Sequence, residues 1–181
     1  MQPAVFLDRD GTLIEDPSFA FRPEQYELLP GVLDGLKALQ ERFLLFVITN
    51  QAGIGRGYYS VADFWSYHQL LLDDLERAGV ELAATRFCPH RREDGCTCRK
   101  PSPRFIFELA AEWDVDVGAS WVVGDHPSDV RLGKNAGCRT IYLLTGHGAE
   151  HLEQLRDEGP EPDHVSKSFS EVVEFILRES S

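Results

Sequence analysis

Two aspartates separated by a single residue, Asp8 and Asp10, follow directly on a short apolar run near the start of the chain, "AVFLDRDGTL". Like charges this close raise each other's pKa and repel. A pair of acids at the end of a buried segment therefore indicates a cation, or a reaction that uses both groups. A hard cation such as Mg²⁺ binds carboxylate oxygens, and one aspartate can attack phosphorus while its neighbour handles the proton.

Further polar side chains end two other apolar runs. "LLFVITN" ends in Thr49 and Asn50, and "SWVVGD" ends in Asp125, with Asp129 following four residues later. Ligands of doubly wound parallel sheets bind at the carboxyl ends of the strands. We therefore expect these side chains to converge with the first aspartate pair.

Cations lie within reach of the same point. "CRKP" supplies Arg99 and Lys100 just before a segment of helical period. Lys100, Thr49 and backbone N–H groups beside Asp10 could bind phosphate oxygens. Each acid alone could instead be a helix cap or a turn residue, where Asp and Asn are common. Their occurrence at three strand ends together favours a site for Mg²⁺ and phosphate.

Apolar runs that read as strands alternate with segments of helical period along the chain. The predicted strands are 3–8, 44–50, 84–89, 120–125 and 140–144. The first predicted helix follows Gly31, and the others span 61–78, 102–113, 128–136 and 169–178. Residues 157–164 are expected to form a surface loop. This alternation predicts an α/β fold with a doubly wound, mostly parallel sheet.

The length of 181 residues predicts a single domain, residues 1–181. No segment is long enough for a large cap domain, so we expect an open site. The stretch 15–22 and an inserted loop at 88–98 should shape its rim.

The composition is that of an acidic globular protein, with a formal net charge of −12 and a predicted pI near 4.9. Such a surface disfavours nucleic acid, and an anionic substrate would need concentrated local cations. No apolar run approaches the roughly 18 residues of a membrane span. The absence of a signal-like start favours the cytoplasm, and the absence of a long apolar stripe favours a monomer.

Three cysteines and a histidine cluster in "CPHRREDGCTC", as Cys88, His90, Cys96 and Cys98. Three thiolates and an imidazole form a closed, four-coordinate set that suits a structural Zn²⁺. Such an ion would pin this loop beside "CRKP" without joining the chemistry. A redox pair of Cys96 and Cys98, or accidental clustering, is the alternative.

The motifs "FLDRDGTL", "VITN", "RKP" and "VGDHPSD" resemble, in order and over nearly the whole chain, those of the haloacid dehalogenase-like phosphatases. The resemblance implies a Rossmann-like core of that type. It implies Asp8 as the nucleophile that becomes an aspartyl-phosphate, and Asp10 as the general acid/base. Thr49 corresponds to the hydroxyl that holds the phosphoryl group, and Lys100 to the cation that steadies it.

The same resemblance implies a set of ligands for a catalytic Mg²⁺. They are the side chain of Asp8, the backbone carbonyl of Asp10 and the carboxylate of Asp125. Asp129 would orient the site by contacts to these ligands. The implied cofactors are therefore catalytic Mg²⁺ and structural Zn²⁺.

A zinc loop directly before "CRKP" resembles the branch that holds D-glycero-D-manno-heptose 1,7-bisphosphate phosphatases and histidinol-phosphatases. "TNQAGIGRG" is similar to the heptose enzymes, whereas the five-residue spacer between His90 and Cys96 is similar to the histidinol-phosphate enzymes. His126 departs from the heptose enzymes, which usually carry Lys there. The resemblance implies hydrolysis of a phosphorylated metabolite, a heptose bisphosphate at its 7-phosphate or, alternatively, histidinol phosphate. It implies a substrate site lined by Asp16, Phe19, Asn50, Gln51, Arg99 and His126.

Arg56 lies just past the second predicted strand, in a glycine-rich loop "GIGRG". A second phosphate on the substrate would suit its guanidinium fork, and a solvated surface arginine is the alternative.

Two other classes of protein share part of this pattern. A signalling receiver domain is also a doubly wound fold phosphorylated on Asp, but its acceptor does not end the first strand. A zinc-stapled interaction module would not need Asp8, Lys100 and Asp125 together. Turnover of a simple phosphate ester with Mg²⁺ would separate the phosphatase from both.

Overall fold

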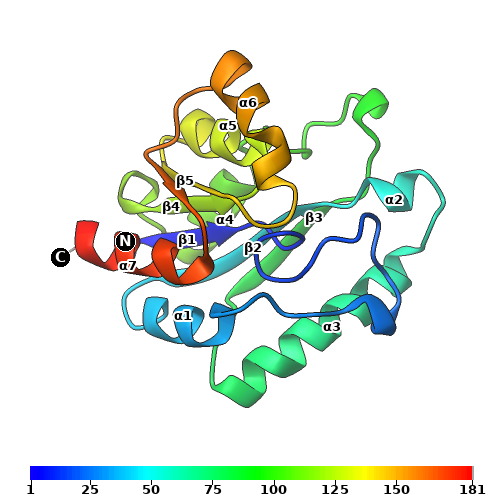
Figure 1. The fold of residues 1–181 in the computed structure, drawn as a ribbon, viewed down its shortest axis with the longest axis horizontal. Coiled ribbons are helices and arrows are strands. Elements are labelled where there is room, and N and C mark those ends of the chain that lie inside the picture. Colours follow the sequence, from blue (N-terminus) through cyan, green and yellow to red (C-terminus); the bar gives the residue numbers. More distant parts are fainter. Residues whose placement is uncertain (181) are drawn as a thin grey trace.

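The computed structural model describes residues 1–180 and shows a six-stranded sheet at the centre of the molecule (Figure 1). Its strands are β1 (Ala4–Leu7), β2 (Leu44–Asn50), β3 (Ala84–Cys88), β4 (Trp121–Gly124), β5 (Arg139–Leu143) and β6 (His164–Ser166). All neighbouring strands pair in parallel, in the order β3-β2-β1-β4-β5-β6. This confirms the predicted doubly wound parallel sheet and places the first strand in its interior.

Helices cover both faces of the sheet. They are α1 (Val32–Leu39), α2 (Ala52–Gly55), α3 (Val61–Ala78), α4 (Arg104–Trp113), α5 (Pro127–Ala136), α6 (Gly148–Glu158) and α7 (Phe169–Glu179), with short 3-10 turns at Pro23–Gln25, Arg92–Asp94 and Val117–Ala119. Helices α1, α3 and α7 pack on one face, and α4 and α5 pack on the other. In the described residues 1–180 no helix has the length and apolarity needed to cross a bilayer.

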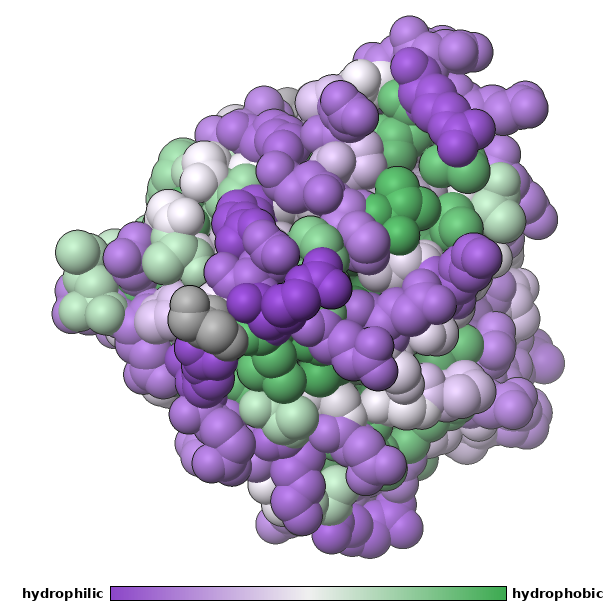
Figure 2. Space-filling view, turned by 60° about the vertical axis from the view of Figure 1, so that its left-hand side comes forward, coloured by the Kyte–Doolittle hydropathy of each residue, from purple (hydrophilic) through white to green (hydrophobic). Residues whose placement is uncertain are grey.

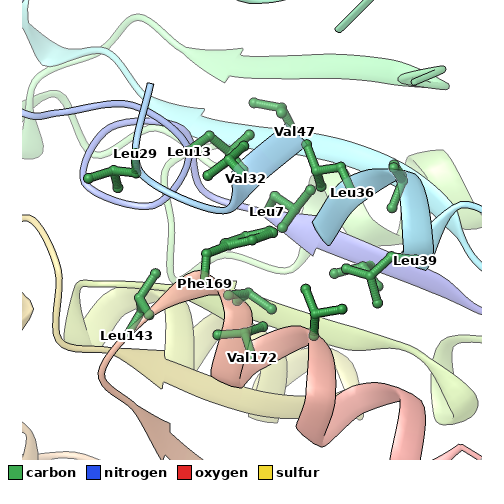
Figure 3. Close-up of a cluster of buried hydrophobic side chains, with 14 of the residues drawn as sticks. Leu7, Leu13, Leu29, Val32, Leu36, Leu39, Val47, Leu143, Phe169 and Val172 are labelled. Carbon is green, nitrogen blue, oxygen red and sulfur yellow. The ribbon is translucent and has the colours of Figure 1, made fainter. Parts of the chain in front are cut away.

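The alternation of side chains along β1 explains these two layers. Val5 and Leu7 point into the larger core with α1, α3 and α7, whereas Ala4 and Phe6 point into the smaller core with α4 and α5. A strand that is buried on both faces must be apolar throughout, and that continuous apolar run is the pattern in the sequence. Figure 3 shows the larger core, in which α1 and α7 contribute facing apolar side chains, among them Phe169.

The C-terminal third holds elements that the sequence did not predict. Helix α6 and strand β6 are additional, so the expected loop at 157–164 is confined to the residues between them. Helix α6 is largely polar and packs through Leu155 against Val130 and Tyr142. With so few apolar positions its helical period was not recognisable.

Two smaller expectations were wrong. The "GIGRG" segment is not an open loop, because Ala52–Gly55 forms the single-turn helix α2 and Arg56 caps its end. Trp113, at the end of the apolar face of the predicted helix 102–113 and therefore expected to be buried, is 38% exposed and packs edge-on against Phe46. Polar residues dominate the face shown in Figure 2, in keeping with the acidic composition.

Candidate active site

The carboxyl end of β1 places Asp8 beside a buried ammonium group. Lys100 Nζ lies 2.8 Å from Asp8 Oδ1 and 2.7 Å from Asp129 Oδ1, and it donates to the carbonyl of Ile48 at 3.0 Å. Lys100 is 5% exposed. A buried charge is stable only when it is paired and hydrogen-bonded, and these contacts supply both conditions. The sheet thus brings together residues from three distant segments, as the sequence predicted.

Three carboxylates converge at this point. Asp8, Asp125 and Asp129 each offer an oxygen, and these atoms lie within 4.8 Å of one another. Asp125 Oδ2 accepts the backbone N–H of His147 at 2.9 Å. Asp129 Oδ2 accepts the backbone N–H of His126 at 3.1 Å, as part of the cap of α5. The remaining oxygens form an oxygen-rich donor set that suits Mg²⁺.

Crowding of these acids shifts their proton affinities. Burial raises the pKa of Asp8 to about 6, against the opposing effect of Lys100. Burial, followed by the charges of Asp8 and Asp129, raises the pKa of Asp125 to about 8. Burial alone would lower the pKa of Lys100, but the two neighbouring carboxylates hold it above its usual value. A divalent cation would relieve this repulsion, so the donor set fits Mg²⁺.

Asp10 faces away from this group toward a buried arginine. Arg9 Nη2 donates to the two oxygens of Asp10 at 2.8 and 2.9 Å, and Arg9 Nε does so at 3.1 and 3.2 Å. The guanidinium is 1% exposed and lies over the rings of Phe64 and Tyr67, at 5.1 and 5.2 Å. Arg9 and Lys100 are therefore the positive groups beside the two aspartates of the motif. No pattern in the sequence predicts this role for Arg9, because neither its burial nor its ring partners are local features of the chain.

Gln51 links the general acid/base candidate to the hydroxyl of β2. Its Nε2 donates to Asp10 Oδ2 at 2.8 Å and to Thr49 Oγ1 at 2.7 Å, while its Oε1 accepts from Tyr59 at 2.7 Å. Thr49 Oγ1 also lies 3.4 Å from Asp10 Oδ2. Both N–H groups of the Gln51 amide are thus used by protein partners, and these contacts position Thr49 and Asp10.

Asn50 uses its side chain on the backbone of the neighbouring loop. Its Oδ1 accepts from the N–H of Lys100 at 3.0 Å, and its Nδ2 donates to the Lys100 carbonyl at 3.4 Å. This two-point contact joins the end of β2 to "CRKP" and sets the position from which Lys100 reaches Asp8. The contact of Asn50 to substrate stays a prediction.

A pocket of about 810 Å³ opens above these groups and is lined by all seven residues predicted to contact substrate. They are Asp16, Phe19, Asn50, Gln51, Arg56, Arg99 and His126. Phe19 has a left-handed backbone, with φ of 53°, and its ring faces the Arg56 guanidinium at 5.7 Å. The pocket extends along α5 and α6 to Arg131 and His151, which sequence reasoning did not single out.

His126 caps α5 and presents a defined face to the pocket. Its Nδ1 accepts the backbone N–H of Ser128 at 3.1 Å, and burial, with the neighbouring His151, lowers its pKa to about 4. A neutral ring that accepts at Nδ1 carries its proton on Nε2. His126 can therefore donate one hydrogen bond to a ligand, where a lysine would supply a charge.

The cysteine cluster forms beside the pocket. Sulfur atoms of Cys88, Cys96 and Cys98 lie 3.3 to 3.6 Å apart, and His90 Nδ1 lies 3.3 Å from Cys98 Sγ and 3.7 Å from Cys88 Sγ. Zn–S bonds of about 2.3 Å in a tetrahedron place sulfur atoms about 3.8 Å apart. The four ligand atoms therefore fit around one Zn²⁺. All four cysteines of the chain are free, so the loop is not closed by a disulfide.

Comparison with known proteins agrees with this geometry. Residues 97–172 match the HAD-hydrolase-like family model, HAD standing for haloacid dehalogenase. D-glycero-D-manno-heptose-1,7-bisphosphate 7-phosphatase of Thermosynechococcus vestitus is 35% identical, over 97% of this chain and 95% of its own length. The corresponding enzyme of Bordetella bronchiseptica is 33% identical over 97% of this chain and 98% of its own length. The chain belongs to the haloacid dehalogenase-like phosphatase family.

The fold of a family member supports the same conclusion. The crystal structure of the heptose 1,7-bisphosphate phosphatase of B. bronchiseptica, complexed with magnesium and phosphate, superposes with a TM-score of 0.89 at 32% identity, over 98% of this chain and 99% of that one. Membership of this phosphatase family decides against the receiver domain and the interaction module. The resemblance found in the four motifs is confirmed.

Proposed function

We propose that the chain hydrolyses D-glycero-D-manno-heptose 1,7-bisphosphate at its 7-phosphate, through an aspartyl-phosphate on Asp8. The observation that carries the proposal is the contact of Asp8 with buried Lys100 inside a group of three carboxylates. Relatives that share about a third of their residues over nearly the whole chain bear the name of this activity.

The residues divide the reaction between them. An Asp8 oxygen forms the new bond to phosphorus, and the ester bond to the sugar oxygen breaks. Protonated Asp10 gives its proton to that leaving oxygen and then takes one from the water that hydrolyses the aspartyl-phosphate. Lys100 and the Thr49 hydroxyl hold oxygens of the phosphoryl group.

The contacts of Asp10 hold its carboxylate in a fixed position for proton transfer. Its two oxygens accept from Arg9, and one also accepts from Gln51. A general acid/base must be held within reach of the reacting atoms, and these contacts supply that orientation. A bound Mg²⁺ would be held by Asp8, Asp125 and the backbone carbonyl of Asp10, and it supplies positive charge that stabilises the transferring phosphoryl group.

The pocket itself supports a substrate with a second phosphate. Besides Arg9, which is paired with Asp10, four arginines line it, although the chain carries a net charge of −12; they are Arg56, Arg92, Arg99 and Arg131. Guanidinium forks match phosphate oxygens in geometry as well as in charge. A phosphomonoester with a neutral or cationic remainder would offer most of these guanidinium groups no second anion to bind.

The deciding experiment compares phosphate release from heptose 1,7-bisphosphate and from histidinol phosphate, with Mg²⁺ and with EDTA. Phosphorus NMR of the product shows whether the 7-phosphate or the 1-phosphate has left. Preference for the bisphosphate with loss of the 7-phosphate supports the proposal. Preference for histidinol phosphate would mean that the short spacer between His90 and Cys96 is the better guide to substrate.

Three further features complete the proposal. Residues 1–181 act as one domain, with the loop 88–98 held by Zn²⁺. The active form is a monomer, for which light scattering should return a mass near 20.4 kDa. The enzyme works in the cytoplasm, where a phosphorylated sugar is available and free thiols persist.

A further inference from the structure

The turn that joins β5 to α6, residues 145–148 with Gly148 as the first residue of the helix, packs directly against the carboxylate site. The backbone N–H of His147 donates to Asp125 Oδ2 at 2.9 Å. Thr145 Oγ1 donates to the Gly11 carbonyl, in the loop that follows the aspartate pair, at 2.6 Å. One short turn therefore holds both a carboxylate of the metal group and the loop that carries the nucleophile.

Glycine is required at the point of contact. Gly146 has a φ of +52° and Gly11 a φ of +78°, a region that favours glycine. A methyl group built on either residue would overlap Asp125 Oδ2, and one on Gly146 would also overlap the backbone of Gly11. Asp125 is 3% exposed, so its side chain cannot move into solvent to make room. The Asp125 carboxylate thus occupies the space that the absent side chains of the two glycines leave, and their backbones fix its position.

The same turn also reaches the rim of the pocket. The imidazole of His147 lies with Nε2 3.4 Å from Asp16 Oδ2. Asp16 Oδ1 in turn accepts the backbone N–H of Ser18, in the left-handed segment that leads to Phe19. The backbone of His147 therefore faces the metal group, while its side chain faces the rim.

We propose that the turn 145–148 is the positioning element of this site: Gly146 and the His147 N–H orient Asp125 toward the cation, and the His147 side chain orients the rim loop at Asp16. The hydrogen bond to Oδ2 leaves Asp125 Oδ1 for the metal. The proposal rests on the proposed Mg²⁺-dependent function only for the part that concerns substrate. It concerns residues at a strand end that sequence reasoning passed over.

The proposal has a metal half, the orientation of Asp125, and a rim half, the orientation of the loop at Asp16. The metal half is tested by measuring Mg²⁺ binding to Gly146→Ala, by titration calorimetry and by the rise in melting temperature on adding Mg²⁺. Contacts that orient a metal ligand are worth on the order of 10- to 100-fold in affinity. Gly146→Ala should weaken Mg²⁺ binding by at least about 10-fold. The matched control is Gly137→Ala, which also has a positive φ, +87°, but has open space where the methyl group would lie. It should bind Mg²⁺ as the wild type does.

Equal Mg²⁺ affinity in Gly146→Ala and Gly137→Ala would overturn the metal half. If Gly146→Ala does not fold, Thr145→Val decides, because it removes only the hydroxyl bond to Gly11. It should weaken Mg²⁺ binding, and Thr145→Ser should restore it. Wild-type affinity in folded Thr145→Val would then overturn the metal half.

The rim half is tested with His147→Ala, which keeps the backbone N–H on Asp125. It should raise KM for heptose 1,7-bisphosphate severalfold and leave Mg²⁺ affinity unchanged. An unchanged KM, or a parallel loss of Mg²⁺ affinity, would overturn this half. If the wild type does not hydrolyse the bisphosphate but the glycine variants differ in Mg²⁺ binding as expected, the proposed substrate fails and the positioning of Asp125 stands.

Discussion

At the scale of single residues, the site separates its two aspartates by giving each its own cation. Asp8 contacts Lys100, and Asp10 contacts Arg9. Both cations are almost completely buried, so water screens neither pair. The two cations offset the repulsion between the two carboxylates. Two like charges only two residues apart can therefore take different roles.

Asp8→Asn is the residue-scale test of the nucleophile. The amide has nearly the same shape but is a far weaker nucleophile, so phosphate release should fall by at least about a thousandfold. Circular dichroism should show an unchanged fold, because Lys100 keeps its contact with Asp129. Release at the wild-type rate would exclude Asp8 as the attacking group.

His68 supplies a pH-dependent test of stability outside the site. It is buried, its Nε2 lies 2.9 Å from Thr85 Oγ1, and burial, with the charge of Arg9, lowers its pKa from 6.5 to about 3. Between these values the unfolded chain takes up a proton that the folded protein does not. The contribution of neutral His68 to the free energy of unfolding is therefore fully present above about pH 6.5. It is lost as the pH falls toward 3, by up to about 1.4 kcal/mol per pH unit.

Urea unfolding at pH 7, 6 and 5 measures this effect. The wild type should lose more stability over this range than His68→Gln, which has no proton to bind. An identical change in the free energy of unfolding with pH for the two proteins would show that His68 does not remain neutral in the folded state.

At the scale of elements, the sequence predicted the strands that carry the site better than the segments that close it. Strand β2 and helix α3 have the predicted bounds, because a continuous apolar run and a strict helical period are local signals. Helix α6 was missed because its burial depends on a contact of Leu155 with distant residues. The turn 145–148 follows a predicted strand, so the rule that selected Asp8 and Asp125 would have selected Thr145 and His147 as well. What no local pattern contains is the burial of Arg9 between two rings of α3.

The loop 88–98 should depend on zinc as a unit. Cys96→Ser removes one of four ligands, so bound zinc should fall well below one ion per chain and the melting temperature should drop. Activity should fall indirectly, because Arg99 Nη1 donates to the His90 carbonyl of this loop at 3.3 Å. Metal analysis beside calorimetry measures both effects. Cys138→Ser, which alters a buried thiol outside the cluster, is the control and should keep its zinc; equal zinc in the two variants would contradict the assignment.

The rim formed by α2 and the 15–22 segment should bind the second phosphate of the substrate. Arg56 lines the pocket, and its guanidinium faces Phe19. Arg56→Ala should therefore raise KM for heptose 1,7-bisphosphate about tenfold or more, and leave a monophosphate such as p-nitrophenyl phosphate nearly unchanged. Arg77→Ala provides a control, since this arginine lies in the last turn of α3, outside both the rim and the pocket. A similar loss on both substrates would return Arg56 to the class of solvated surface arginines.

At the scale of the whole molecule, the core that holds the sheet together and the pocket at the edge of the sheet are built from nearly separate sets of residues, which share Ala20. Leu36, in the middle of α1, is fully buried in the larger core (Figure 3), and α1 contributes no residue to the pocket. Leu36→Ala should lower the free energy of unfolding by about 2–5 kcal/mol, a large share of the roughly 5–15 kcal/mol typical of a domain. Phosphate release per folded molecule should stay at the wild-type level at temperatures below the new transition.

The volume-conserving variant Leu36→Met separates cavity formation from other effects of changing this position. It should cost less than about 1.5 kcal/mol, because methionine refills most of the space that alanine leaves. Urea denaturation gives the stability of each variant, and initial rates at 20 °C give the activity. If Leu36→Ala lost activity in proportion to stability while still fully folded, the pocket would depend on the packing of α1, and the two halves of the molecule would be coupled. Independence is expected, because α1 contributes no residue to the pocket, and the contacts that join the strand ends there, through Lys100, Asn50 and Gln51, do not pass through this helix.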